Sequence, residues 1–310
     1  MRATPVMLAL AKDMEELCPD AYILNYVNQM TIVCWALGGA SKIKFVGLCH
    51  GVMGNAKHFA RLAGAPFEEV NFTCAGINHM TWFTRYEHNH QDLLPTIHSA
   101  IRERYPESKP YQFRGELLEA FGYYCTESDR HFPEYVPWFQ NGDRELFDPH
   151  VAITMNIKNK RANMYKDMGV AAEEAEKDSL KLTRSHEAAS GIMEAAVTHK
   201  PYTFSGNVMN RGLISNLPEE CCVEVPCTAD KNGIHGQAQG SLPIQCAALC
   251  RSNIIMQELA VEAIRQRSKD LAFQALLMDP VTQANVTIKQ ARAMFEELWE
   301  AEGDLLAAYG

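Results

Sequence analysis

A cysteine and a histidine, each placed within or just after an apolar run, are the residues of this chain best suited to bind a metal. Cys49 lies in the segment Gly47–Val52, and His79 lies in Cys74–Met80. A thiolate and an imidazole suit a soft-to-borderline divalent metal. Each residue also has a structural interpretation, because cysteines after strands are often small core residues and histidines beside asparagines are often only hydrogen-bonded. The local pattern leaves both interpretations open.

Polar neighbours of this pair offer acid–base chemistry. His50 follows Cys49 directly, and an imidazole titrates near neutral pH, so it suits a general acid or base. Its structural alternative is a histidine that lines a turn. Asn28 follows an apolar run and opens a helical pattern, where an asparagine either caps the helix or contacts a ligand. The sequence favours neither role enough to exclude the other.

The segment from Tyr124 to His131 is rich in ionisable residues and is flanked by Phe121, Tyr135 and Trp138. Charged groups among aromatic rings are typical of a cleft that binds a polar, ring-shaped substrate. A solvated loop between aromatic core residues explains the same pattern equally well.

The elements that must position these residues alternate at the start of the chain. Hydrophobic spacing predicts helices over 4–17, 28–37 and 52–62, and strands over 21–26 and 43–48. Such alternation predicts a parallel sheet with right-handed crossovers. Ligands of these sheets bind beyond the carboxyl ends of the strands. Asn25, Asn28, Cys49 and His50 all fall at those ends.

The pattern changes near residue 70. Strand-like pieces occur over 201–225, the charged stretch 158–181 suggests a solvated helix, and apolar stripes predict helices over 244–265, 268–277 and 288–308. We therefore expect two domains. Residues 1–70 would be the carboxy-terminal part of a dinucleotide-binding domain, and residues 71–310 an α+β substrate and metal domain that ends in helices.

Composition narrows the class of protein. The chain has 310 residues, a net charge of −9, and ten cysteines that sit within apolar runs. Excess negative charge argues against nucleic acid or an anionic membrane as a partner. No apolar run approaches the ~20 residues that span a bilayer, and no signal segment opens the chain. Thiols in a long chain that needs no disulfides indicate a soluble protein of the cytoplasm.

Eight segments in sequence order together resemble one family, the NAD- and manganese-dependent glycosidases of glycoside hydrolase family 4. The likeness runs from Arg2 to Leu306 and is greatest to the α-galactosidase (melibiase) branch. The segments are Leu24–Asn28, Val46–His50, Cys74–Met80, Phe121–Ser128, Gly206–Val208 with Gly212–Ile214, Asn216–Pro218, Cys222–Val225 and Asn232–Ile234. The resemblance implies an α/β fold: the remnant of a doubly wound, Rossmann-like sheet of the lactate/malate dehydrogenase type, with a larger α+β domain.

The chemistry that the resemblance implies differs from ordinary sugar hydrolysis by two carboxylates. In this family NAD⁺ oxidises the hydroxyl at sugar carbon 3, which acidifies the hydrogen at carbon 2. A base removes that proton while a divalent metal, Mn²⁺ or another, stabilises the developing charge. The glycosidic oxygen leaves, water adds, and the retained hydride restores the sugar.

The resemblance also implies roles for individual residues of this chain. The resemblance implies Cys49 and His79 as metal ligands and His50 as the group that protonates the leaving oxygen. Asn28 and Asn78 would bind the substrate.

Three further roles follow from the same resemblance. Asn25 would contact the cofactor, NAD. Tyr135 is the first choice for the base at carbon 2, and Asp129 is the second, because the matching segment varies within the family. A tyrosine base needs its pKa lowered by the metal or by nearby cations.

The sequence departs from the family pattern at several positions. It begins after the expected strand, glycine-rich turn and acidic residue, so we expect an amino-terminally truncated chain that lacks most NAD contacts. Gln29 replaces a proline, and His235 stands where relatives often have glutamine. Gly51 replaces the serine of galactosidase relatives, which admits a bulkier group such as a uronic acid carboxylate.

The leading prediction is an α-galactosidase that acts on small-molecule α-glycosides. The first alternative is an α-galacturonidase with the same mechanism. A simple 2-hydroxy-acid dehydrogenase and a non-catalytic truncated fragment are alternatives from other classes. Relatives usually assemble and the carboxy-terminal helices carry apolar stripes, so we expect a homo-oligomer.

Overall fold

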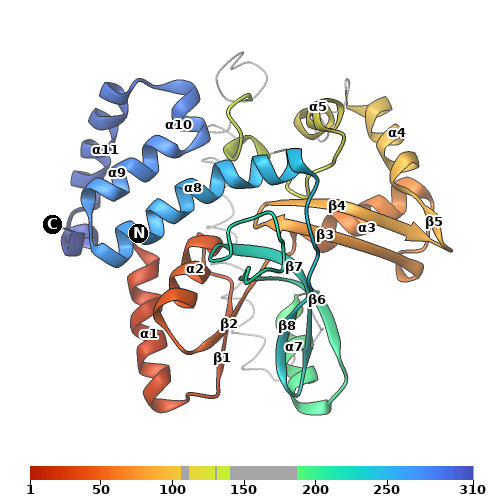
Figure 1. Cartoon of the computed structure of the whole chain (residues 1–310), viewed down its shortest axis with the longest axis horizontal. Coiled ribbons are helices and arrows are strands. Elements are labelled where there is room, and N and C mark those ends of the chain that lie inside the picture. The colour runs from red at the N-terminus through yellow and green to blue at the C-terminus, as the bar shows by residue number, and fades with distance from the viewer. Residues whose placement is uncertain (106–111, 130, 140–186, 310) are drawn as a thin grey trace, which may run out of the picture.

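One mixed sheet organises the chain in a computed structural model that describes residues 1–105, 112–129, 131–139 and 187–309. Its described strands run in the order β1-β2-β6-β7-β3-β4-β5, and β8 pairs with β7 (Figure 1). The strands are β1 (Tyr22–Asn25), β2 (Lys44–Leu48), β3 (Val70–Ile77), β4 (Met80–His88), β5 (Gln91–Asp92), β6 (Tyr202–Met209), β7 (Cys222–Asp230) and β8 (Gly233–Gly236).

Parallel pairing in the described sheet is confined to β1 and β2, and the other pairs are antiparallel. The predicted α/β class is confirmed. Strand β6 lies beside β2, so the sheet continues from the first 70 residues into the rest of the chain. The division into domains 1–70 and 71–310 stays a prediction.

The amino-terminal helices match the predicted spacing closely: α1 (Ala3–Leu17), α2 (Met30–Ala40) and α3 (Gly51–Ala63). Helix α2 is apolar on every side, and it is buried from Met30 to Leu37. Helix α3 ends at Gly64, whose φ of +68° favours glycine. These helices fix the loops that leave β1 and β2.

The carboxy-terminal part is helical; its first and longest helix packs against α2 and β3, and the helices that follow lie beyond it, away from the sheet (Figure 1). In chain order these helices are α8 (Ile244–Gln266), α9 (Lys269–Met278), α10 (Pro280–Asn285) and α11 (Ile288–Glu302), with the 3-10 turn η4 (Gly303–Tyr309). Side chains of Ser268, Asp279 and Thr287 cap α9, α10 and α11. The predicted helices over 244–265, 268–277 and 288–308 are confirmed, apart from the 3-10 turn that ends the last one.

Shorter elements surround the β3–β4 hairpin. They are η1 (Phe67–Glu69), α4 (Leu94–Arg104), α5 (Gln112–Phe121), η3 (Phe132–Glu134) and α7 (Ala188–Thr198). The expected helix over 158–181 lies outside the described residues. Two apolar clusters meet at the hairpin, one around Trp82 between sheet and α8, and one around Phe59 and Phe83 under α3. The hairpin is therefore packed on both faces, which holds its turn in place.

Candidate active site

The tight turn between β3 and β4 presents the predicted histidine. Asn78 and His79 form this turn, between the paired residues Ile77 and Met80. His79 has a φ of +65°, a conformation that non-glycine residues rarely adopt and that concentrates at functional sites. Because Met80 and Ile77 are fully buried, the packed hairpin can hold His79 in this conformation.

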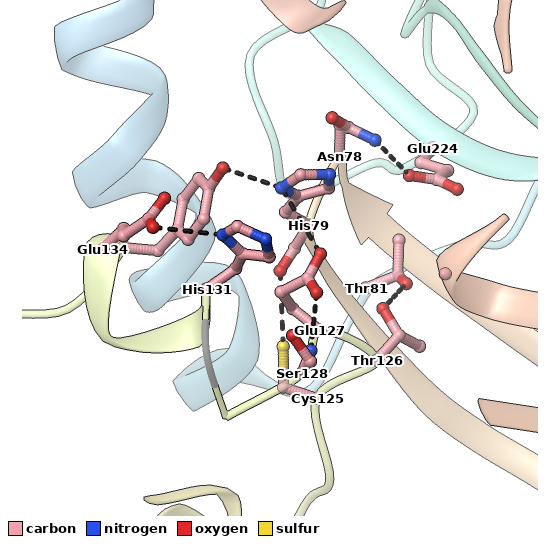
Figure 2. A network of polar contacts seen from close by, with 12 residues as sticks. Asn78, His79, Thr81, Cys125, Thr126, Glu127, Ser128, His131, Glu134 and Glu224 are labelled. Carbon is pink, nitrogen blue, oxygen red and sulfur yellow. Dashed lines mark hydrogen bonds and ion pairs between the residues drawn. The ribbon is translucent and has the colours of Figure 1, made fainter. Parts of the chain in front are cut away.

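The imidazole of His79 is oriented by two groups from the loop that follows α5. Its Nδ1 lies 2.8 Å from the hydroxyl of Tyr135 and 3.3 Å from Oε2 of Glu127 (Figure 2). Both contacts are at Nδ1, which leaves Nε2 as the nitrogen that suits a metal. Burial lowers the pKa of His79, with Glu127 opposing the shift. A neutral imidazole is the form that ligates metals.

Cys49, directly after β2, lies against this turn. The Asn78 side chain and the backbone of Gly51 favour the thiolate form of Cys49. Burial, reinforced by Glu224, raises the pKa of the Cys49 thiol to about 12. A bound divalent cation would oppose that burial effect and favour the thiolate. His50 is near enough to act electrostatically on His79.

A buried carboxylate that sequence reasoning missed lies beneath the turn. Glu224 of β7 is 1% exposed and accepts a hydrogen bond from Asn78 Nδ2 at 3.1 Å (Figure 2). Burial raises the pKa of Glu224 to about 7. The signal was present in the sequence, because a glutamate interrupts the apolar run Cys222–Val225.

The other residues that sequence reasoning missed come from the ionisable segment it had singled out. Glu127 contacts His79, as described above. His131 has its ring centroid 6.2 Å from that of His79, and its Nδ1 lies 3.1 Å from Oε1 of Glu134 (Figure 2). The segment therefore lines the site rather than forming only a solvated loop.

The two candidate bases lie in different environments. Tyr135 contacts His79, and burial raises the pKa of its phenol, so it needs a nearby cation to ionise. Asp129 instead accepts a hydrogen bond from Arg114 Nε at 2.6 Å, and from the backbone N–H groups of Phe113 and Arg114. Burial raises the pKa of Asp129, and Arg114 opposes this. Tyr135 therefore lies beside His79, whereas Asp129 is paired with Arg114.

The two asparagines near β1 differ in exposure. Asn25 is 2% exposed; its side chain accepts a hydrogen bond from the Val27 N–H and donates to the Val27 carbonyl. Asn28 is exposed and is not the cap of α2, because that position belongs to Gln29. The Asn28–Gln29 peptide is cis. Asn28 is thus free for a ligand, whereas the Asn25 amide is used within the turn.

The donor set fits a divalent metal held jointly with a substrate. Among the described residues, no three His, Cys, Asp or Glu side chains gather as a complete metal cage. Cys49 and His79 would supply two ligands, and positions would then stay open for oxygens of a substrate, as catalytic sites require. For a dinucleotide the fit is partial. Asn28 lines a niche of about 280 Å³ with the first residues of α1 and α2.

Family models match both parts of the chain. The model described as "Family 4 glycosyl hydrolase" matches residues 1–65, and that of the "Family 4 glycosyl hydrolase C-terminal domain" matches residues 74–282. The chain belongs to family 4 of the glycosyl hydrolases. The resemblance inferred from the sequence is confirmed, and a 2-hydroxy-acid dehydrogenase is thereby ruled out.

Curated relatives carry several activities within this family. The chain is 37% identical to an alpha-galactosidase of Bacillus subtilis over all of its own length and 72% of the relative's. It is 34% identical to an alpha-galactosidase of Rhizobium meliloti, over 99% of its length and 65% of the relative's. It is 27% identical to an alpha-galacturonidase of Bacillus subtilis, over 96% of its own length and 71% of the relative's.

A solved family structure shares the fold. The 6-phospho-alpha-glucosidase from gut microorganisms, determined in complex with NAD and Mn²⁺, superposes with a TM-score of 0.80 at 22% identity. The match covers 98% of this chain and 71% of that one. None of the described helices combines the length and apolar character needed to cross a bilayer.

Proposed function

We propose that this family 4 member is an α-galactosidase that uses NAD and a divalent metal, with Mn²⁺ as the first choice. We infer the substrate from sequence identity, which is higher to two alpha-galactosidases (37% and 34%) than to the alpha-galacturonidase (27%). The contacts among Cys49, Asn78, His79 and Tyr135 support the chemistry.

The proposed function gives each side chain of the site one role in the reaction. Cys49 would hold the metal through its sulfur and His79 through Nε2. Tyr135 accepts the proton from carbon 2, and His50 donates a proton to the glycosidic oxygen as it leaves. Asn78 binds a sugar hydroxyl through its amide. The metal, when bound, supplies Lewis-acid stabilisation of the charge that develops on the sugar oxygens.

The NAD side of the site rests on fewer residues. Asn28 lies at the carboxyl edge of β1, where dinucleotides and substrates bind in such sheets. NAD⁺, when bound, accepts and later returns the hydride of sugar carbon 3. The contact of Asn25 with the cofactor stays a prediction. Because the Asn25 amide hydrogen-bonds to the backbone of Val27, it suits a role in shaping the turn better than direct contact with NAD.

A specific observation favours α-galacturonides as a second candidate substrate. Gly51 follows His50, and a Cβ atom at this position would lie 3.6 Å from the sulfur of Cys49. The missing side chain leaves space beside the metal ligands, where the carboxylate of a uronic acid would fit. Gly51→Ser should then lower activity on galacturonides and not on galactosides.

We further infer a cytoplasmic homo-oligomer of the two predicted domains, without nucleic-acid or membrane partners. All ten cysteines are free thiols, which suits a reducing compartment. The net charge of −9 disfavours anionic partners. Ile288, Leu298 and Leu305 are exposed on α11 and η4, and apolar side chains of this kind suit a subunit seam.

The test compares 4-nitrophenyl α-galactoside with the matching α-galacturonide, in the presence of NAD⁺, Mn²⁺ and a thiol reductant. We expect the galactoside to turn over, chelation of Mn²⁺ to stop the reaction, and deuterium at carbon 2 to exchange with solvent. Preference for the galacturonide would establish the second candidate. Retention of all deuterium would exclude proton removal at carbon 2, and a chain that binds Mn²⁺ but cleaves neither would be a non-catalytic fragment.

A further inference from the structure

Glu224 is a carboxylate in the middle of an apolar strand and in the middle of the sheet. It is 1% exposed, while its neighbours Val223 and Val225 are fully buried. Burying a carboxylate is costly unless hydrogen bonds compensate it. Among the described residues, no lysine, arginine or histidine forms a salt bridge with Glu224, so its burial calls for an explanation other than packing.

The strand register puts Glu224 in a row that leads to the site. Asn25, Gly47, Asn207, Glu224 and Gly76 are successive partners across β1, β2, β6, β7 and β3. Partners in register share one face of a sheet. The two glycines carry no side chain; a Cβ on Gly47 would lie 2.9 Å from that of Asn207. Glycine is needed at position 47 because the sulfurs of Met30 and Cys34 and the Cβ of Asn207 fill the space that a side chain would take.

Hydrogen bonds occupy both oxygens of Glu224. Oε2 accepts from Asn78 Nδ2 at 3.1 Å, and Oε1 accepts from Ser205 Oγ at 3.2 Å. The side chain of Asn207, the partner of Glu224 in the register of β6 and β7, also favours the ionised carboxylate. Because the carboxylate only accepts, it fixes the Asn78 amide with its NH₂ group inward and its oxygen away from Glu224 (Figure 2).

The Asn78 amide favours the thiolate of Cys49, so the hydrogen bond from Asn78 to Glu224 connects the buried carboxylate to the surroundings of the sulfur. We propose that Glu224 is a positioning residue, which holds the Asn78 amide in the one orientation that supports Cys49 as a metal ligand and turns the amide oxygen toward the sugar. This inference rests on the proposed function, in which Cys49 binds the metal. Outer partners of this kind typically change metal affinity about 10- to 100-fold.

The experiment measures Co²⁺ affinity of the full chain through the thiolate-to-cobalt charge-transfer absorbance, without substrate or NAD. Glu224→Gln keeps the volume but is a weaker acceptor, and we expect about 5- to 10-fold weaker Co²⁺ binding. In an Asn78→Ala background the same substitution should change affinity less than about twofold, because the intermediate group is gone. Ser205→Ala is the matched control, since it removes a partner of Glu224 without touching Asn78, and it should leave affinity within about twofold.

Three outcomes separate the claims. An equal loss from Glu224→Gln with and without Asn78 would show a through-space charge effect and overturn the positioning role. The positioning role would also be overturned if the charge-transfer band depends on Cys49 but Glu224→Gln binds Co²⁺ with unchanged affinity. A wild-type chain with the same spectrum as Cys49→Ser would overturn the metal site itself, and the role of Glu224 with it.

Discussion

The Nδ1 atom of His79 lies 2.8 Å from the phenol oxygen of Tyr135, so an expected metal ligand and the expected base are in direct contact. The Tyr135 ring is half-buried, and this burial raises the pKa of the phenol. A metal on the far side of the imidazole would bring positive charge within reach of Tyr135 and oppose that effect. In the proposed mechanism, the base therefore depends on the metal.

Tyr135→Phe removes the proton acceptor and keeps the ring. We expect kcat on the α-galactoside to fall about 100-fold or more, because loss of a general base costs at least this much. Metal affinity should change little, since Glu127 still contacts His79. Exchange of deuterium at carbon 2 should stop. Tyr123→Phe, on a half-buried ring of the same core, should leave kcat unchanged; full activity of Tyr135→Phe would assign the proton transfer elsewhere.

Cys49→Ser should abolish Mn²⁺-dependent activity and leave the fold intact. A serine hydroxyl is neutral, so it binds a divalent cation more weakly than the charged thiolate that it replaces. The measurements are Mn²⁺ affinity by calorimetry and the midpoint of thermal unfolding without metal. Cys18→Ser, at the one exposed cysteine, is the control and should alter neither. Unchanged turnover in Cys49→Ser would remove Cys49 from the metal site.

Asp129→Asn should destabilise the fold. The substitution leaves Arg114 buried without its anion, and breaking such a pair costs about 3–5 kcal/mol. Urea unfolding measures this loss. The exposed pair of Arg102 and Glu119 provides the comparison, because Glu119→Gln should cost less than about 1 kcal/mol. A stable Asp129→Asn chain with lost kcat would instead make Asp129 the base.

Local spacing predicted most of the helices because each apolar stripe is a property of neighbouring residues. The pairing of Gly47 with Asn207 joins residues far apart in the sequence, and nothing in either strand specifies that partner. The antiparallel pairing of β6 with β2 could therefore not be predicted from the sequence and is seen only in the structure. The same holds for the contact between Arg114 and Asp129, since the sequence gives charges but not partners.

The candidate site shows the same limit. Residue types and strand ends singled out Cys49 and His79, and the family resemblance gave them roles. Asn78 links them in space through contacts that no local pattern encodes. Glu224 was visible as an acidic residue in an apolar strand, but its meaning depends on the register that sets it beneath Asn78.

The buried carboxyl of Glu224 should make metal-free stability depend on pH. Burial raises its pKa from 4.5 to about 7, with Glu127 acting in the same direction. The folded chain then binds more protons than the unfolded chain between these values, so stability falls as pH rises from about 4.5 to about 7. The full effect is about 3 kcal/mol, from 1.36 kcal/mol for each pKa unit.

Glu224→Gln removes this titration, so the difference in unfolding free energy between wild type and variant isolates it. The difference is needed because burial also lowers the pKa of His98 to about 4, which makes stability rise with pH over part of the same range. Urea unfolding at pH 5, 6, 7 and 8 is the measurement, and wild type should lose stability relative to the variant over this series. Parallel curves would mean that Glu224 keeps an ordinary pKa, and that its hydrogen bonds fully compensate its burial.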